Sequence, residues 1–308
     1  MRLQRRGLGL VLVLASAAGA QAKISVTTRL VNVGFTARSV QGTLVTDLRQ
    51  DELEVLQDGE PEKVAFFSRS QDLPLSLGIV MDVSGSQSNF AQRHADDLEK
   101  FLQALLTARD RAFLLCFSDQ LRLVGDFSNS AFALVWRLRH YSGHYDYPEV
   151  GPKLERDGGT ALFDAIYDGA DKLANQSGRR ALLLFSDGED NSSATDEGGA
   201  LAEMQNNDVT VYAIRYSPTH LNARDQYGVR VMDLLASDTG GEAIDAHRFE
   251  PKQYLPGIAA ALRASYELAY YPAGGSPSAG FHKILIRCRR PGVAIYARSG
   301  FREATPPR

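Results

Sequence analysis

Residues 75–86 read LSLGIVMDVSGS, a run of apolar residues that ends in an aspartate and two serines. Residues 75–81 carry no charged side chain, which is typical of a central parallel strand covered on both faces. The polar residues follow at the point where such a strand would end. The stretch therefore predicts an α/β domain with polar side chains at the carboxyl end of a central strand, where open parallel sheets bind ligands.

The segments after this run alternate between strand and helix patterns. Strand patterns cover residues 111–119, 121–127, 179–187, 209–217 and 241–246. Helix patterns cover residues 131–138, 160–174, 196–204, 231–237 and 251–265, after a first one whose apolar stripe holds Phe90, Leu98, Phe101, Leu102, Leu105 and Leu106. This alternation predicts right-handed βαβ units and a doubly wound, mostly parallel sheet with helices on both faces. We expect residues 121–127 to form an edge strand.

Both ends of the chain show β patterns without helices. The first set covers residues 24–33, 42–48, 53–56 and 64–67, with a turn centred on Asp58-Gly59; the second covers 266–272, 282–290 and 293–301. Neither set has enough strands to be stable alone. We therefore predict that the N-terminal β segment (23–70) and the C-terminal β segment (266–303) pair into one small β unit. The α/β domain (71–265) is then an insertion, and residues 304–308 form a tail.

The first 22 residues have the features of an export signal. Arg2, Arg5 and Arg6 precede an apolar stretch at residues 7–18, and small residues at Ala18, Ala20 and Ala22 suit cleavage. The apolar stretch is too short to span a bilayer comfortably. A cleaved signal peptide is predicted, and with it a secreted or periplasmic protein without a membrane span in the mature chain. A signal anchor that stays attached is the alternative.

Composition excludes some classes of function. The chain has 308 residues and a formal net charge of -3, whereas nucleic-acid binders normally show a basic face. Cys116 and Cys288 lie far apart in strand-like runs. We interpret them as buried free thiols, although export would permit a disulfide between them.

Three short polar segments stand next to predicted strands or helices. They are Asp82-Val-Ser84-Gly-Ser86, Gly158-Gly159-Thr160 and Ser186-Asp187-Gly188. In extended backbone, side chains at positions i, i+2 and i+4 point the same way, so the oxygens of the first segment can face one ion. All three segments offer carboxylate and hydroxyl oxygens without sulfur or imidazole. Such ligands favour Mg²⁺, Ca²⁺ or Mn²⁺ over zinc and copper.

This pattern resembles the metal-ion-dependent adhesion site (MIDAS) of von Willebrand factor type A (VWA) domains, the fold shared with integrin I domains. The matching residues are Asp82, Ser84, Ser86, Thr160 and Asp187, and the resemblance covers residues 73–265. It implies that the two serines and the threonine bind a metal ion directly or through water, and that the aspartates bind it or support its ligands. The flanking β segments, with Asp58-Gly59 and Tyr270-Tyr271-Pro272, are similar to a secreted bacterial subfamily, the acidobacterial VWFA-related proteins.

The resemblance implies divalent-metal-dependent protein–protein binding, in cell adhesion or in assembly of an envelope complex. Mg²⁺ is the expected ion, and an acidic residue of the protein partner would complete its coordination without catalysis. Related domains shift their last helix on ligation, here the one predicted at 251–265. Two alternatives stay open: a metal-dependent phosphohydrolase, although Ser84 stands where such enzymes usually carry a second acid, and a scaffold with a purely structural metal. Without any metal, Ser84, Ser86 and Thr160 would simply cap helices.

The polar loop before Gly158 carries several aromatic residues. We predict that Tyr141, His144, Tyr145 and Tyr147 help to choose the partner, because tyrosine-rich loops favour protein recognition. An aromatic cluster that holds the loop to the domain is the alternative. After Asp187, residues 189–191 make the rim acidic. They could tune the metal or supply a second ion site, and the alternative is that they are simply solvated.

Overall fold

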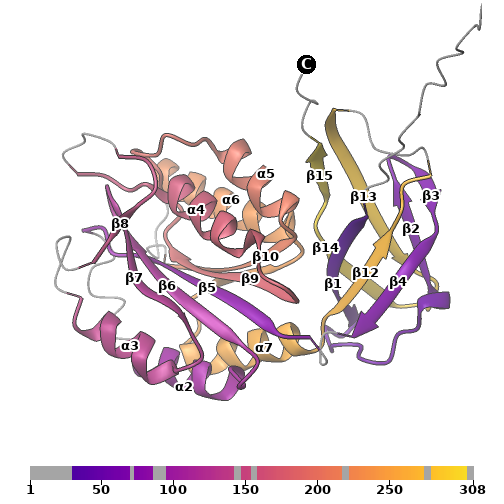
Figure 1. Ribbon diagram of the computed structural model, residues 1–308, viewed down its shortest axis with the longest axis horizontal. Helices are drawn as coiled ribbons and strands as arrows, with labels where there is room; N and C mark the ends of the chain where they lie inside the picture. The colour runs from indigo at the N-terminus through magenta and orange to yellow at the C-terminus, as the bar shows by residue number, and fades with distance from the viewer. Residues whose placement is uncertain are drawn as a thin grey trace, which may run out of the picture.

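A computed structural model describes residues 30–69, 73–85, 95–141, 147–153, 158–216, 222–273 and 279–303 (Figure 1). Within them a mixed sheet forms the centre of the α/β domain, with the strand order β11-β10-β9-β5-β6-β7-β8. Its parallel strands are β5 (Leu75–Asp82), β6 (Arg111–Phe117), β9 (Arg179–Ser186), β10 (Val209–Arg215) and β11 (Glu242–Asp245). The predicted doubly wound, mostly parallel sheet is confirmed.

The sheet ends differently from the prediction on one side. β7 (Leu121–Ser128) runs antiparallel to β6, and β8 (Glu149–Val150) pairs with β7 on its other side. The expectation that residues 121–127 form the edge strand is therefore wrong. The pattern did not reveal β8, because two residues inside a polar loop carry too little periodicity to be recognised.

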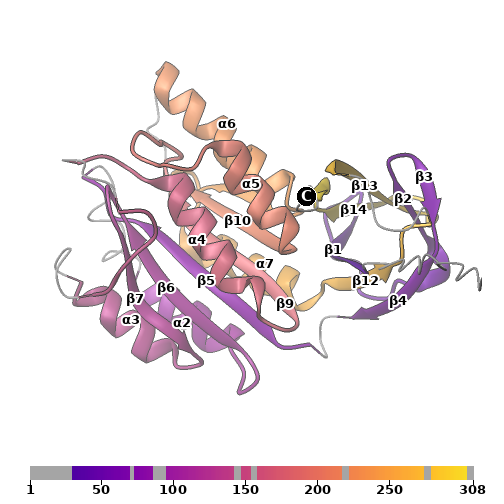
Figure 2. The ribbon, with the colours of Figure 1, turned by 45° about the horizontal axis from the view of Figure 1, so that its top comes forward.

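Helices cover both faces of the central sheet (Figure 2). One face packs against α2 (Ala95–Leu105), α3 (Ala131–Arg139) and α7 (Pro251–Arg263), and the other against α4 (Leu162–Ala174), α5 (Glu197–Asn206) and α6 (Ala223–Ser237). Alternate residues of β5 enter the two cores: Ile79 and Met81 join the first, and Val80 joins the second. Burial on both faces explains why this strand is a continuous apolar run.

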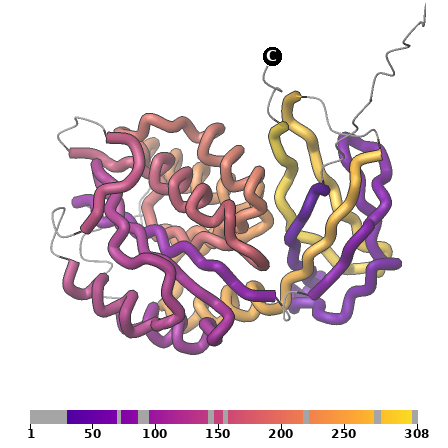
Figure 3. Tube along the Cα trace, viewed as in Figure 1, coloured from indigo at the N-terminus to yellow at the C-terminus, as the bar shows by residue number. Residues whose placement is uncertain are grey.

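The two ends of the chain build a β unit beside this domain. One sheet has the order β14-β1-β12-β4 and the other β15-β13-β2-β3, so each contains strands from both ends (Figure 3). The N-terminal strands are β1 (Val31–Ser39), β2 (Leu53–Gln57), β3 (Glu60–Glu62) and β4 (Val64–Arg69). The C-terminal ones are β12 (Tyr266–Tyr270), β13 (Gly280–Cys288), β14 (Val293–Ala297) and β15 (Gly300–Glu303). A shared apolar core, including Val33, Phe35 and Ile284, joins the sheets.

Local details of the β unit differ from the sequence prediction. β1 begins at Val31, and the residues before Leu30, which include residues 24–29 of the predicted strand and the predicted signal peptide, lie outside the described part. Residues 42–48 form no strand; Leu44 makes only an isolated bridge. The predicted Asp58-Gly59 turn is present, with both residues at positive φ.

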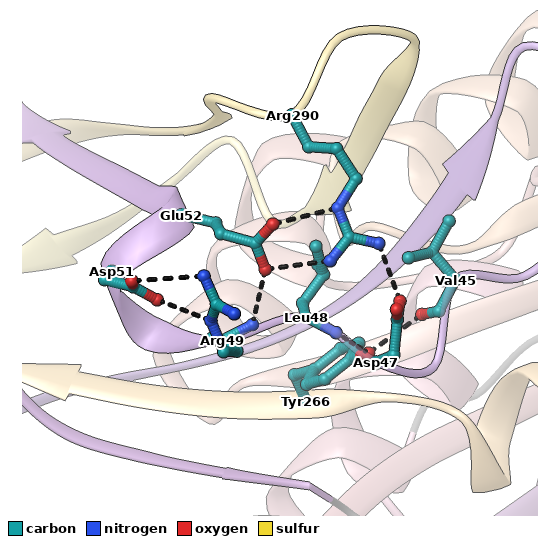
Figure 4. Close-up of polar contacts among 8 residues, drawn as sticks. All are labelled: Val45, Asp47, Leu48, Arg49, Asp51, Glu52, Tyr266 and Arg290. Carbon is teal, nitrogen blue, oxygen red and sulfur yellow. Dashed lines mark hydrogen bonds and ion pairs between the residues drawn. The ribbon is translucent and has the colours of Figure 1, made fainter.

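Residues 45–52 are held in place by hydrogen bonds and ion pairs of side chains rather than by strand pairing (Figure 4). The buried Tyr266 hydroxyl accepts a hydrogen bond from the N–H of Leu48 at 3.0 Å and donates one to the carbonyl of Val45 at 2.9 Å. Beside it, Arg290 pairs with Glu52 at 2.9 Å and with Asp47 at 2.7 Å. The hydrogen bond from Arg290 lowers the pKa of Glu52 to about 2. The first residue of β12 thus fixes a segment of the N-terminal half.

The buried carboxylate of Asp110 bonds to both segments that connect the α/β domain with the β unit. Asp110 accepts a hydrogen bond from the N–H of Leu75, the first residue of β5, at 2.8 Å. It also bonds the guanidinium of Arg263 at the end of α7, just before β12 begins. Desolvation would raise the pKa of Asp110, but the hydrogen bonds from Arg263, Thr107 and Leu75 hold it at about 2.

We expect Asp110→Asn to lower the free energy of unfolding by about 2 kcal/mol near neutral pH. The folded pKa of Asp110, about 2, lies below its ordinary value of 3.8, so this stabilisation is present above about pH 4 and is lost as the pH falls towards 2. Urea unfolding of both proteins at several pH values measures it. The exposed Asp96→Asn is the control. A difference between wild type and Asp110→Asn that did not change with pH would contradict this account.

The β unit contacts the domain at the amino ends of the central strands. Both carboxylate oxygens of Asp208, just before β10, accept the N–H of Gly34 in β1 at 3.1 and 3.0 Å. A Cβ at Gly34 would collide with the guanidinium of Arg179, the first residue of β9. Ser299 donates its N–H to the carbonyl of Asp238 at 3.0 Å. The carboxyl ends of the strands consequently point away from the β unit.

Two further features concern the whole chain. None of the helices in the described residues is long and apolar enough to cross a membrane. Cys116 and Cys288 are both free thiols. Cys116 is buried as expected, whereas Cys288 is half-buried because it lies at the end of β13.

Candidate metal site at the carboxyl ends of the strands

The first segment of the candidate site follows β5 directly. Asp82 is the last residue of that strand and is 1% exposed. Its Oδ1 accepts the N–H of Ser84 at 2.9 Å, and the Ser84 hydroxyl also bonds its carboxylate. The N–H of Val83 donates to the carbonyl of Phe117 at the end of β6, which continues the pairing of these strands by one residue. Ser86 lies outside the described residues.

The second segment follows β9, the neighbour of β5. Ser186 is buried, and its hydroxyl donates to Oδ2 of Asp82 at 2.9 Å while accepting the N–H of Gly188 at 3.1 Å. Asp187 accepts the N–H of Glu189 at 3.1 Å. Gly188 has φ 86°, and a Cβ there would meet the carbonyl oxygen of Gly228 in α6 at 2.2 Å. The second loop is therefore bonded to the first and covered closely by α6.

The third segment precedes α4. Thr160 is 7% exposed, and its N–H donates to the side-chain oxygen of Asn191 at 2.8 Å. In return, its carbonyl accepts the N–H of Asn191 at 3.1 Å. Gly159 has φ 129°, and a Cβ there would meet the same asparagine oxygen at 2.6 Å. The Gly-Gly-Thr sequence thus lets this loop lie directly against the one that follows Asp187.

The loop after β6 was not identified from the sequence. Ser118 accepts the N–H of Ala161 on its carbonyl at 2.7 Å. The carboxylate of Asp119 accepts the N–H of Gly158 at 3.2 Å and the Ser118 hydroxyl at 2.8 Å. Phe117-Ser118-Asp119 repeats the sequence of Phe185-Ser186-Asp187 at the corresponding strand end. This repeat was the signal for a residue that positions the third segment.

The acidic residues after Asp187 have structural partners. Asp190 accepts the N–H of Phe163 in the first turn of α4 at 3.3 Å. Asn191 holds Thr160, as described above, and Glu189 forms an ion pair with Arg224 at 2.8 Å. Asp190 and Asn191 thus both bind backbone groups of the third segment and its helix, although Asn191 is exposed.

The electrostatics of the site centre on Asp82. Burial, together with the charge of Asp187, raises the pKa of Asp82 to about 6 against the hydrogen bonds from Ser84 and Ser186, which lower it. Within the described part of the chain, no lysine, arginine or histidine forms an ion pair with Asp82. A buried carboxylate without a cation is costly. This environment favours a positive ion.

The residues described fit a hard divalent cation. Their side chains offer two carboxylates, Asp82 and Asp187, and the hydroxyls of Ser84 and Thr160, which are oxygen ligands of the kind that Mg²⁺ and Ca²⁺ prefer. No group of three or more histidine, cysteine or acidic side chains gathers for metal binding in the described ranges. An ion held here would therefore depend on hydroxyls and water as well as carboxylates.

The aromatic loop is described only at its two ends. Tyr141 and Tyr147 stack with ring centroids 5.8 Å apart and pack against the core beneath α3. The Tyr147 hydroxyl donates to the carbonyl of Arg137 at 3.4 Å. His144 and Tyr145 lie outside the described residues, and partner recognition by this loop stays a prediction.

Comparisons with known proteins give structural neighbours only, since the sequence matches no protein-family model and no curated protein. An aerotolerance-related membrane protein from Bacteroides fragilis is 16% identical over 61% of this chain and 98% of its own, with a TM-score of 0.46. Proximal thread matrix protein 1 from the mussel byssus, with a zinc-occupied MIDAS motif, is 13% identical over 67% of this chain and 49% of its own (TM-score 0.47).

A third neighbour, the vWF domain of the type V pili tip protein Mfa5 from Porphyromonas gingivalis, is 17% identical over 38% of each chain (TM-score 0.28). The chain thus spans nearly all of the first neighbour, about half of the second and less of the third. At these TM-scores the likenesses carry no argument about function, which must come from the site itself.

Proposed function

We propose that this protein binds a protein partner through a divalent metal ion held at the carboxyl ends of β5 and β9. The observation that carries the proposal is the buried carboxylate of Asp82, bonded to Ser84 and Ser186 and near Asp187, without a basic partner among the described residues. Bound Mg²⁺ would supply the missing positive charge and an open coordination position. The MIDAS resemblance assigns Ser84, Ser86 and Thr160 to the same ion.

The chain's own residues prepare the site in this proposal. Hydrogen bonds among the loops fix the ligand oxygens before an ion arrives, which lowers the cost of ordering them. The hydroxyl ligands are neutral, and a carboxylate that binds only through water leaves positive charge on the ion, so an anionic group of the partner is the natural further ligand. A side chain with aspartate or glutamate chemistry would therefore complete the site. We place this binding outside the cytoplasm, in adhesion or envelope assembly, because of the predicted signal peptide.

The orientation of the site suits a binding role. The β unit packs against the opposite end of the central strands, through contacts such as that of Asp208 with Gly34. The carboxyl ends therefore lie on the side of the domain away from the β unit (Figure 1). A partner can approach them without displacing the β unit.

The test is a pull-down from envelope extract with wild type and Asp82→Ala, each with Mg²⁺ and with EDTA. We expect captured proteins that EDTA removes and added Mg²⁺ restores, and that Asp82→Ala does not capture. Capture that is indifferent to Asp82→Ala in a folded protein would contradict the proposal and favour a structural metal. Metal-dependent turnover of a phosphoester such as p-nitrophenyl phosphate, lost in Asp82→Ala, would favour an enzyme instead.

A further inference from the structure

A cavity lies away from the candidate metal site, along the side of the central sheet. It is a cleft of about 750 Å³ beside β11. Val229 of α6 lines it from one layer, and Tyr254, Gly257 and Ile258 of α7 line it from the other. Ala243 and Ile244 of β11 also line it. We call it the edge cleft.

The edge cleft borders an unpaired strand edge. β11 pairs with β10 on one side only in the described structure. The N–H of Ala246 donates to the carbonyl of Arg215 in β10 at 2.9 Å. Backbone groups of alternate strand residues point to opposite neighbours, so those of Ala243 and Asp245 point away from β10. Arg248 already donates its N–H to the carbonyl of Asp245. The N–H and C=O of Ala243 and the N–H of Asp245 therefore face the cleft side.

Helices flank this strand edge on both faces of the sheet, so the edge lies at the bottom of a cleft. α6 packs on one face of the sheet and α7 on the other, and residues of both helices line the cleft beyond β11. The space between the two layers has the position of a further strand of the sheet. An extended peptide would pair with β11 and be covered on both faces, which is strand addition to a sheet edge.

The charged residues around the cleft indicate the charge of the segment that would bind there. Arg38 pairs with Glu242 at 3.2 Å, Arg215 with Asp233 at 3.4 Å, and Arg248 with Asp245 at 3.3 Å. These charged groups at the rim balance one another inside the chain. The complementary segment is consequently uncharged where it lies in the cleft, with apolar side chains facing Val229 on one side and Ile258 on the other.

The length of the cleft is sufficient for strand pairing. β11 has four residues, which extend over about 13 Å. A second cavity of about 260 Å³ continues past Arg38 and Glu242, which line both cavities, and reaches Tyr296 of the β unit.

We propose that the edge cleft binds an uncharged, extended segment of a partner protein, which adds a strand to the central sheet beside β11. Main-chain hydrogen bonds to Ala243 and Asp245 supply part of the affinity, and the apolar walls from α6 and α7 select small or β-branched side chains. This binding is separate from the proposed metal site and does not require an ion.

Gly257 allows a specific test. Nothing lies within 4 Å of a Cβ placed there, so the side chain of Gly257→Leu has room to leave the helix and narrow the cleft that Gly257 lines, and leucine is a better helix former than glycine. Ala260→Leu, at an exposed position of the same helix outside the cleft, is the matched control. Ala243→Pro removes one outward N–H while leaving the bonds to β10, because proline is tolerated on edge strands.

The probe is a fluorescein-labelled heptapeptide of alternating valine and threonine, followed by fluorescence anisotropy in EDTA. We expect saturable binding by wild type and Ala260→Leu. We expect it to be at least about tenfold weaker for Gly257→Leu, for Ala243→Pro, and for the same peptide N-methylated at alternate residues. The proposal is overturned if wild type does not bind, if folded Gly257→Leu binds like wild type, or if N-methylation has no effect.

Discussion

Asp82→Asn is expected to reverse the order of stability of the two proteins when Mg²⁺ is added. In EDTA, the variant should unfold at the same temperature as wild type or higher. The substitution removes a buried charge near Asp187 while keeping an acceptor for the N–H of Ser84. In saturating Mg²⁺, only the wild type should gain stability. At a concentration 100 times the dissociation constant the gain is about 2.7 kcal/mol, which raises the unfolding temperature by about 5–10 °C.

Thermal unfolding with Mg²⁺ and with EDTA measures this reversal. The matched control is Asp164→Asn, because Asp164 is equally buried at 1% exposure and accepts the N–H groups of Ala194 and Thr195, both at 2.8 Å. This control should lose the same stability with and without the ion, since its hydrogen bonds involve only the chain. If Mg²⁺ stabilised wild type and Asp82→Asn equally, the ion would not bind at Asp82, and the proposed function would fail with it.

The sequence predicts best the elements whose burial is uniform. β5, β9 and β10 are buried along almost their whole length because helices cover both of their faces, so the middle of each strand appears as a continuous apolar run. The start of α6 was missed for the opposite reason. Its first six residues, ARDQYG, offer little apolar periodicity, and its Asn222 and Asp225 capping box was a local signal that went unrecognised.

Other features depend on contacts that no local pattern displays. The predicted strand at residues 24–33 stopped short of Gly34, yet β1 continues to Ser39. Gly34 is accommodated in the strand because Arg179, far away in sequence, occupies the space of a Cβ. Likewise, the sequence alone does not show that Asp190 accepts a hydrogen bond from the N–H of Phe163 in the first turn of α4.

The candidate site was predictable as a set of oxygen-bearing residues but not as a network. Residue spacing and position after predicted strands identified Asp82, Ser84, Thr160 and Asp187 as candidate ligands. The hydrogen bond from Ser186 to Asp82 and the role of Asn191 at Thr160 depend on which loops are neighbours in space. The sequence gives the chemistry of each side chain, whereas the strand order determines which loops are neighbours and therefore which hydrogen bonds each side chain makes.

Arg298→Met is expected to weaken the contact between the β unit and the α/β domain, with a loss of about 3–5 kcal/mol in the free energy of unfolding. The Arg298 side chain is only 6% exposed and lies 3.5 Å from the carboxylate of Asp208. It also donates to the carbonyls of Gln205 at the end of α5 and Asn32 in β1. Removing the guanidinium leaves the largely buried carboxylate of Asp208 without this positive charge and the two carbonyls without this donor.

Combining Arg298→Met with Asp208→Asn should recover part of that loss, because the amide no longer leaves a buried charge unpaired and its oxygen can still accept the N–H of Gly34. Arg287→Met is the control: its side chain is 59% exposed and 3.9 Å from Glu54, so it should change stability by less than about 1 kcal/mol. Urea unfolding of the four proteins gives the comparison. A double variant no more stable than Arg298→Met would mean that lost packing, rather than the unpaired Asp208, causes the effect.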